Sequence, residues 1–308
     1  MAGLTEAQKQ LLNEIAGLDC MPGGAINIRA NGETQTRQVT ENIDITSKTD
    51  VPGIDIKVKS TCKGETMYIP VVIDESGRKE TVYNDFFIED GAEVTIIAGC
   101  GIHNCGGEDS EHDGIHRFYV GKGAKVKYVE NHYGGGDGNG KRIMNPGTEV
   151  YMDEDSSVEM EMVQIKGVDS TIRTTKSELK KGAKLVVRER LMTHGNQYAE
   201  SIYTTDLNGD GASADVVSRS VARDKSYQKY TSRITGNAAC SGHTECDAIL
   251  MDEARVLAIP ELDAANLDAA LVHEAAIGKI AGDQLIKLMT LGLTPEEAEE
   301  QIINGFLG

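Results

Sequence analysis

The sequence predicts an all-β protein, a parallel β-helix with a short N-terminal helix and a small C-terminal helical region. Three observations lead to this fold class: a turn that recurs through the middle of the chain, an abundance of glycine and a scarcity of aromatic residues. Glycine accounts for 34 of the 308 residues, whereas the chain holds four Phe and no Trp. Such a composition suits short strands joined by tight turns, in which each unit covers the one before it.

The turn recurs with a period typical of stacked supersecondary units. Intervals of 32, 32, 27 and 29 residues separate its occurrences, which begin at Gly91, Gly123, Asp155, Gly182 and Gly211. The segments between turns alternate apolar and polar residues, as in AEVTIIAG and AKLVVRER, which indicates strands with one buried face. Residues 85–235 lack the 3.6-residue period of helical repeats. We therefore expect a β-helix core over residues 24–280; a β-sandwich with coincidental turns is the alternative.

Residues 1–23 predict an N-terminal helical segment. The residues on one side of this amphipathic helix are Leu4, Leu11, Leu12 and Ile15. Charged residues interrupt the segment, so it does not resemble a signal peptide. The chain also has no apolar run of about 18 residues, the length that a membrane span needs. The six cysteines are irregularly spaced, which favours free thiols or metal ligands over disulfides. Together these features predict a cytoplasmic location.

Residues 281–308 predict a small helical region after the β-helix. A helix is expected from Asp283 to Leu291, ended by Gly292. The second helix begins at Thr294-Pro295-Glu296-Glu297, a capping box with proline at the first helical position. Helices this short are not stable alone, so we expect them to pack on the β-helix or on a partner.

The chain is strongly acidic, with 31 Lys and Arg against 49 Asp and Glu and a net charge of −18. Binding to nucleic acid depends on clustered basic residues, and so does binding to anionic membranes. We therefore expect neither nucleic acid nor a membrane among its partners.

A thiol, an imidazole and a carboxylate stand out as candidate metal ligands in the last quarter of the chain. Cys246 lies between two acidic residues, and the pair His273 and Glu274 follows 27 residues later. These are ligand types that iron and zinc accept. One copy of such a set cannot enclose a metal cluster, but a two-fold axis would double every ligand. Taken alone, Cys246 also fits a small buried apolar residue, and the flanking acids should raise the pKa of its thiol.

A second group of potential ligands lies earlier in the chain and suggests a zinc-binding structural protein as an alternative. Its spacing, Cys-x4-Cys followed by His-x3-His, comes from Cys100, Cys105, His112 and His116. A polar loop with inward-facing histidines is the simpler interpretation of the same pattern. Cys240, six residues before Cys246, is a candidate auxiliary thiol that also fits simple packing.

The C-terminal part, residues 242–306, resembles the SufB/SufD family of iron–sulfur cluster assembly scaffolds. The residues that carry the resemblance are Thr244-Glu245-Cys246-Asp247, Ile259-Pro260-Glu261, His273-Glu274-Ala275-Ala276, Ile280-Ala281-Gly282-Asp283-Gln284-Leu285 and Ile302-Ile303-Asn304-Gly305-Phe306. The repeat extends the match loosely over most of the chain. The short chain is similar to minimal archaeal and bacterial members, in which one protein would act as a homodimer.

The resemblance implies a right-handed β-helix that dimerises through its last part and carries a nascent iron–sulfur cluster at the interface. It implies a non-catalytic scaffold whose C-terminal helices dock a SufC-like ABC-type ATPase, and which exchanges iron and sulfur with a sulfur donor and apo acceptor proteins. Cys246 matches the interface cysteine of SufB, and His273 and Glu274 match the histidine and glutamate that follow it. Val272 stands where SufB has an acid.

Enzymes that cleave polysaccharides are the other alternative, because parallel β-helices often carry lyases or hydrolases that use paired acids. Such enzymes are usually secreted and present aromatic platforms to sugars. The absence of Trp makes this function a weaker match to the chain.

Overall fold

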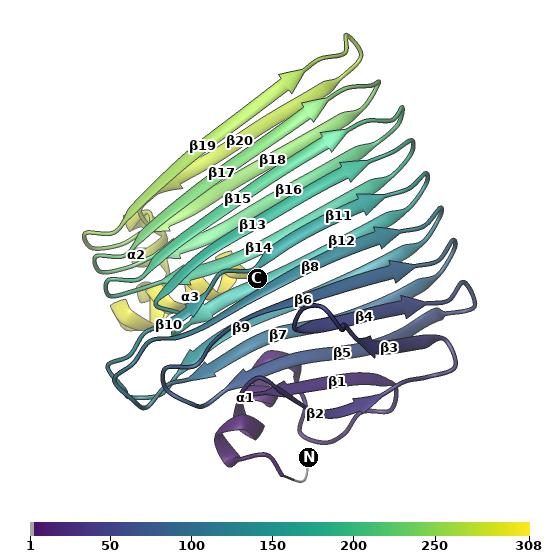
Figure 1. Cartoon of the computed structure of the whole chain (residues 1–308). Helices are drawn as coiled ribbons and strands as arrows, with labels where there is room; N and C mark the ends of the chain where they lie inside the picture. The colour runs from purple at the N-terminus through teal and green to yellow at the C-terminus, as the bar shows by residue number, and fades with distance from the viewer. Residues whose placement is uncertain (1–2) are drawn as a thin grey trace.

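The computed structural model describes residues 3–308, most of which form strands of a parallel β-helix with about eight turns (Figure 1). The predicted fold class is therefore confirmed. From β4 onward the chain alternates between two sheets, with β10 and β11 together in one of them, so each turn of the β-helix adds to both sheets. Every pairing is parallel except β1 with β2 and β3 with β4, which close the N-terminal end as antiparallel pairs.

The strands fall into two ten-stranded sheets. Sheet A runs in the order β2 (Glu33–Gln38), β1 (Ala25–Ala30), β5 (Lys63–Ile73), β7 (Glu93–His103), β9 (Lys125–Gly135), β12 (Ser157–Lys166), β14 (Lys184–Thr193), β16 (Ser213–Ala222), β18 (Ser241–Leu250) and β20 (Ala270–Gly278). Sheet B runs in the order β19 (Arg255–Ala264), β17 (Tyr227–Gly236), β15 (Tyr198–Leu207), β13 (Ser170–Leu179), β10 (Arg142–Met144), β8 (Ser110–Val120), β6 (Lys79–Ile88), β4 (Gly53–Val58) and β3 (Ile43–Ser47). β11 (Gly147–Met152) continues beyond β10 and pairs with β8 and β13.

The core lies between the two sheets, because alternate side chains of each strand point inward. Equivalent positions of successive turns are stacked in register, so interior residues form columns along the axis. The rings of Phe86 and Phe118, for example, stack with centroids 4.3 Å apart. The alternation that predicts strands in the sequence thus also decides which residues enter the interior.

The predicted turns form one corner of the β-helix. Each adopts a left-handed backbone conformation, with φ between 56° and 74° at Gly91, Gly123, Asp155, Gly182 and Gly211. The N–H of Gly182 donates to the carbonyl of Asp210 over 3.0 Å, and that of Gly211 donates to Ala239 over 2.7 Å. A small, buried residue closes each corner: Cys62, Ala92, Ala124, Ser156, Ala183, Ala212 and Cys240. Cys240 thus occupies a position that demands a small side chain.

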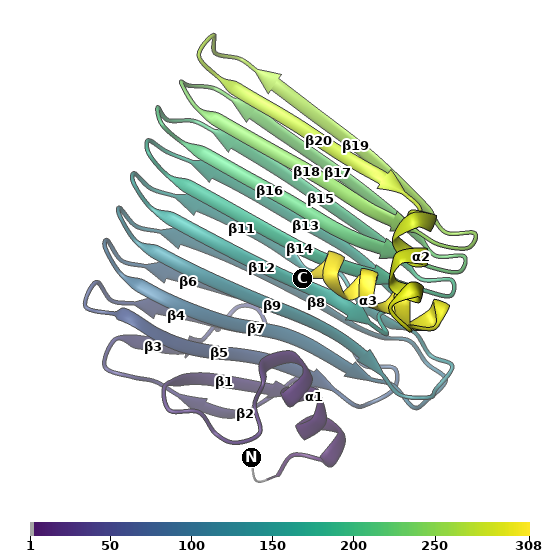
Figure 2. The same ribbon diagram turned by 180° about the vertical axis from the view of Figure 1, so that it is seen from behind.

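Helices cover the outer face of sheet A at both ends of the chain (Figure 2). α1 (Glu6–Ala16) begins with a capping box at Thr5 and buries the predicted face of Leu11, Leu12 and Ile15. α3 (Pro295–Leu307) begins with the predicted capping box at Thr294. Both helices contact strands of sheet A.

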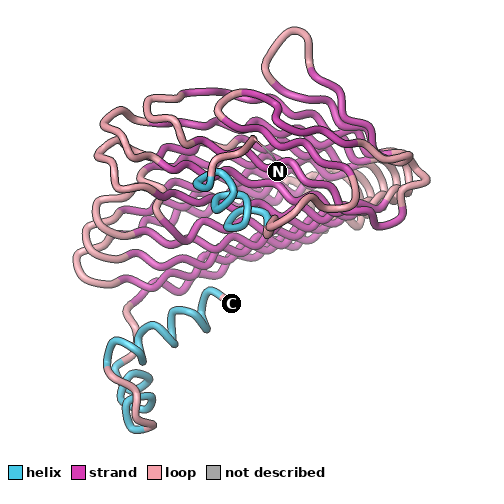
Figure 3. The backbone as a smooth tube through the Cα atoms, turned by 90° about the horizontal axis from the view of Figure 1, so that it is seen from below, coloured by secondary structure: helices cyan, strands magenta, loops and turns pink. Residues whose placement is uncertain are grey.

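The two C-terminal helices differ in how far they are buried, and Figure 3 shows them beside the stack of strands. Ile303 and Leu307 of α3 pack against Val221 of β16, and Glu299 pairs with Arg223 over 2.9 Å. α2 (Gly282–Thr290) buries none of its residues. Leu285 and Leu288 are half-buried and α2 contacts α3, but Ile286, Met289 and Leu291 remain exposed.

Within residues 3–308, no helix combines the length and the apolar character that crossing a membrane would require.

Replacing Gly209 by Ala should lower the free energy of unfolding by roughly 2–3 kcal/mol, because the new Cβ would lie 2.0 Å from the backbone nitrogen of Lys181. Gly211→Ala should cost about 1 kcal/mol, since its φ of +74° is unfavourable but its Cβ has room. Urea unfolding followed by circular dichroism measures both. The matched control is Gly107→Ala, which meets no atom within 4 Å and should have little effect. Equal losses at Gly209 and Gly211 would contradict the close stacking of this corner.

Candidate functional site

The β-helix ends at β19 and β20, which are the edge strands of the two sheets. Leu262 and Ile277 align with the buried residues Ile234 and Ala248, so they face the interior of the last turn. They nevertheless remain 41% and 42% exposed because no turn covers them. The opposite end is different, since β2 and β3 are short and largely polar. The C-terminal end is therefore an open, apolar end of the core, here called the open end.

Cys246 faces the interior one turn below the open end. It is 1% exposed and aligns with Ser218 of β16 and Ala275 of β20. Burial, and then the charge of Glu189, raise the pKa of its thiol to about 12. The predicted direction is thus correct, but the flanking acids are not the main cause. Both point outward, because neighbours in a strand face opposite sides.

His273 also faces the interior, in the last turn itself. It aligns with Thr244, a buried residue whose hydroxyl lies 2.9 Å from the hydroxyl of Tyr230. The Nδ1 atom of His273 is buried and has no hydrogen-bond partner in the described part of the chain. A buried, unpaired nitrogen is costly, so this atom is well suited to a ligand at the open end. His273 and Cys246 are diagonal neighbours on adjacent strands.

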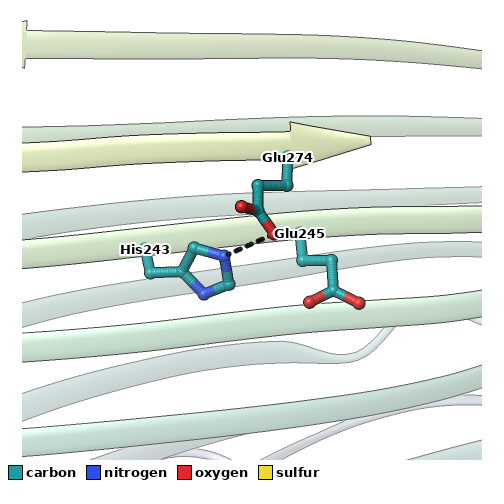
Figure 4. A group of neighbouring side chains, drawn as sticks. All are labelled: His243, Glu245 and Glu274. Carbon is teal, nitrogen blue, oxygen red and sulfur yellow. Dashed lines mark ion pairs between the residues drawn. The ribbon is translucent and has the colours of Figure 1, made fainter. Parts of the chain in front are cut away.

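Glu274 lies on the other side of β20 and faces outward. It aligns with Glu245, and one of its oxygens lies 3.8 Å from Nε2 of His243 (Figure 4). Among residues 3–308, these three side chains are the group of potential metal ligands whose ligand atoms all lie within 4.8 Å of one another. The structure therefore brings Cys246 and His273 together on the inner face and separates Glu274 from them.

Sequence reasoning missed His243 and Glu245 as companions of Glu274. The signal was available in part, because residues two apart in a strand share a face. What the sequence did not contain was the register of β20 on β18, which places Glu274 beside Glu245. Partial burial and the proximity of Asp247 raise the pKa of Glu245.

The earlier group of cysteines and histidines is divided by the structure. Cys100, His112 and His116 point into the interior, whereas Cys105 is exposed, with its Sγ 3.1 Å from Nε2 of His103. Nδ1 of His112 lies 3.0 Å from a carboxylate oxygen of Glu80. The histidines of this strand thus form the inward-facing ladder that was the simpler interpretation of the pattern.

His132 joins these interior residues and was not foreseen from the sequence. It borders a cavity of about 20 Å³ together with Cys100, His112, His116 and Glu130. Burial lowers the pKa of His116 to about 4, so its imidazole is neutral at pH 7. Its Nδ1 lies 2.7 Å from the hydroxyl of Tyr128.

Buried charges connect this region with the surroundings of Cys246. Arg173 pairs with Glu130, and its Nε lies 3.7 Å from Glu189. Glu189 accepts hydrogen bonds of 2.6 Å from both Ser201 and Ser218. These residues share the inward-facing positions of their strands with the apolar core.

Comparison with known proteins identifies the family of this fold. The family model described as SUF system FeS cluster assembly, SufBD core domain, matches residues 74–306. The match extends over β6, the later strands and both C-terminal helices. It includes Cys246, His273 and the group around Glu274.

Archaeal relatives described as iron-sulfur cluster assembly SufBD family proteins support the match. The relative from Methanothermobacter thermautotrophicus is 29% identical over 235 residues, which cover 74% of this chain and 55% of the relative. That from Archaeoglobus fulgidus is 27% identical over 84% of this chain and 69% of its own length. That from Pyrococcus horikoshii is 26% identical over 96% of this chain and 85% of its own length. The chain thus spans little more than half of the first relative.

Cys246 should react with iodoacetamide at pH 8 far more slowly than the exposed Cys20 and Cys105. A thiol whose pKa rises from 9.0 to about 12 holds on the order of a thousandfold less thiolate, the reactive form. Peptide mass spectrometry after timed labelling measures the rates. Urea should remove the difference, because it removes the burial. Labelling of Cys246 at the rate of Cys105 in the folded protein would contradict this account.

Proposed function

This chain belongs to the SufBD family, whose members are scaffold components of iron–sulfur cluster assembly, and we propose that it acts as a homodimer carrying a nascent cluster at its interface. The observation that carries the proposal is the open end of the β-helix. It combines uncovered apolar side chains, unpaired strand edges and the unsatisfied nitrogen of His273 at one place.

Dimerisation at the open end would cover the strand edges and aliphatic side chains that the last turn of the β-helix leaves exposed. Exposed strand edges with aliphatic side chains promote association, and natural proteins usually block them with charge or cover them. At this end the exposed aliphatic residues on the edge strands are Leu257, Leu262, Val272 and Ile277. A two-fold axis would pair the same strands of two copies and continue the core across the interface.

The ligand set of the proposed cluster follows from the same symmetry. Each protomer supplies Cys246 and His273 on its inner face, so two copies supply two thiols and two imidazoles. Iron–sulfur clusters accept imidazole in place of some thiolates. Ala275 is the residue that separates Cys246 from the open end, and its small side chain leaves a short path to the interface. Iron binding would displace the proton that the high pKa keeps on the thiol.

Glu274 takes a different role in this proposal. Its side chain points away from the interior of the β-helix. Because β20 is an edge strand, Glu274 nevertheless borders the proposed dimer interface. We propose that it holds iron on the way to the cluster. The iron and the cluster are cargo that the scaffold receives from a sulfur donor and other sources and passes to apo acceptor proteins.

The C-terminal helices are the proposed docking site of a SufC-like ABC-type ATPase. α3 is fixed to the β-helix, but α2 leaves Ile286 60% and Leu291 75% exposed. A groove of about 720 Å³ next to the helices is lined in part by Ile277 and Phe306. Movement of a docked partner would therefore be transmitted to the end of β20, close to the cluster ligands.

Reconstitution of the purified chain with iron and sulfide under anaerobic conditions should give a cluster absorption spectrum that Cys246→Ser abolishes. The variant loses the thiolate of each protomer while keeping a side chain of nearly the same size. Ultraviolet–visible absorption and iron analysis after gel filtration measure the result. Cys240→Ser is the matched control and should retain the cluster. An unchanged spectrum in Cys246→Ser refutes the site.

The same experiment tests the interface. Leu262→Lys places a charge on the open end and should convert the dimer into a monomer that binds no cluster, as light scattering and absorption would measure. A monomeric Leu262→Lys variant that still assembles the full cluster contradicts the shared site.

The double variant Ile286→Glu with Leu291→Glu should stay folded but lose its ATPase partner. Both side chains are exposed, so the substitutions should hardly change stability, whereas an apolar docking surface would be destroyed. Co-purification with the co-expressed ATPase measures the effect. Val39→Glu serves as control, because Val39 is also an exposed apolar residue but lies at the opposite end of the β-helix from α2 and α3. Retained co-purification by the double variant argues against docking through α2.

A further inference from the structure

We propose that His243, Glu245 and Glu274 form a mononuclear site for a divalent transition metal on the outer face of sheet A, separate from the cluster ligands inside. The ion is taken to be iron(II), a choice that rests on the proposed function; the site itself rests on its own geometry. Figure 4 shows the three side chains gathered where β18 and β20 meet.

Adjacent strands bring the three ligands together. His243 and Glu245 are two apart on β18 and share its outer face, and Glu274 stands directly opposite Glu245 on β20. Their ligand atoms all lie within 4.8 Å of one another, a span that a single ion can close with small side-chain rotations. All three come from strands of the β-helix rather than from loops, which fixes their positions.

A carboxylate already orients His243 for metal binding. Its Nδ1 lies 2.8 Å from Oδ1 of Asp215, and it donates its proton there because a carboxylate only accepts. This bond leaves the lone pair of Nε2 free on the side of Glu274. Arg188 donates to the other oxygen of Asp215 and holds it in turn. Metal-binding histidines almost always donate their second nitrogen to a carboxylate or carbonyl in this way.

The charges around the group favour a cation. Carboxylates directly opposite each other on neighbouring strands repel, and Asp247 adds a third on the same face. Three arginines line the pocket that His243 and Glu245 share. Arg188 is engaged by Asp215, Arg219 acts on Glu245, and Arg190 lies beside the C-terminal residue Gly308. One imidazole with two carboxylates suits iron(II), manganese or zinc, whereas magnesium and calcium prefer oxygen ligands alone.

The position of the site gives it a role in iron delivery. Glu245 and Cys246 are neighbours in one strand, so the outer ion and the inner thiol lie on opposite faces of β18. Three protein ligands leave coordination positions open, which allows an ion to exchange. Because Glu274 belongs to the edge strand, any movement of the interface that shifts β20 would change the affinity of the site for the ion.

Anaerobic titration of the full chain with Co²⁺ in the absence of sulfide tests the site. We expect one Co²⁺ per chain with weak visible bands of nitrogen and oxygen ligation and no thiolate-to-cobalt charge-transfer band. His243→Gln and Glu274→Gln should each abolish this binding. Asp215→Asn should weaken it by about 10–100-fold, the usual effect of removing such a partner. Circular dichroism of each variant shows whether it is folded.

Two matched controls separate this site from the cluster site. Glu159→Gln removes another carboxylate from sheet A and should bind Co²⁺ normally. Cys246→Ser should also bind Co²⁺ normally while failing to assemble a cluster, whereas His243→Gln should assemble a cluster when iron is in excess. A charge-transfer band that disappears in Cys246→Ser overturns the proposal, as does equal Co²⁺ binding by His243→Gln, by Glu274→Gln and by the unmodified chain, or no binding by the unmodified chain.

Discussion

Parallel hydrogen bonding between successive turns is the interaction on which this structure depends. Each strand bonds to its equivalents in the turns above and below, as β16 does to β14 and β18. Each turn of the β-helix is therefore stabilised by its contacts with the turns above and below it. The strict register also stacks like positions into columns, so the assignment of a residue to the inside or the outside holds along the whole stack. The last turn has a neighbouring turn on one side only, and there interior positions become accessible.

The interior is unusual in holding charges. Glu130, Arg173 and Glu189 are all buried, and the pairing of one guanidinium with two carboxylates offsets part of a desolvation cost of several kcal/mol per ion. Burial opposes ionisation of Glu130, but Arg173 holds its pKa well below its usual range. Burial raises the pKa of the Cys246 thiol, and the charge of Glu189, two strands away, raises it further. The reactivity of Cys246 is therefore set by the interior rather than by its sequence neighbours.

Local signals were sufficient to predict the framework of this protein. The left-handed corners, the capping box at Thr294 and the apolar face of α1 each depend on residues close together in the chain. The site depends on register instead. The register of β20 on β18 decides whether Glu274 lies near Cys246 or near His243. Adjacent residues of a strand point to opposite faces of the sheet, so a shift of one residue would exchange the two outcomes. His132 was missed for the same reason, because its partners belong to other turns.

The stacked corners have a consequence for the length of the molecule. Turns of 27 to 32 residues all fit the same corner, and the differences are absorbed in the connections between strands. Insertion or removal of one whole turn would lengthen or shorten the rod by about 4.8 Å, one strand spacing, and leave every remaining column in alignment. The length and surface area of such a β-helix can therefore change in whole turns during evolution, while the residues at its C-terminal end keep their arrangement.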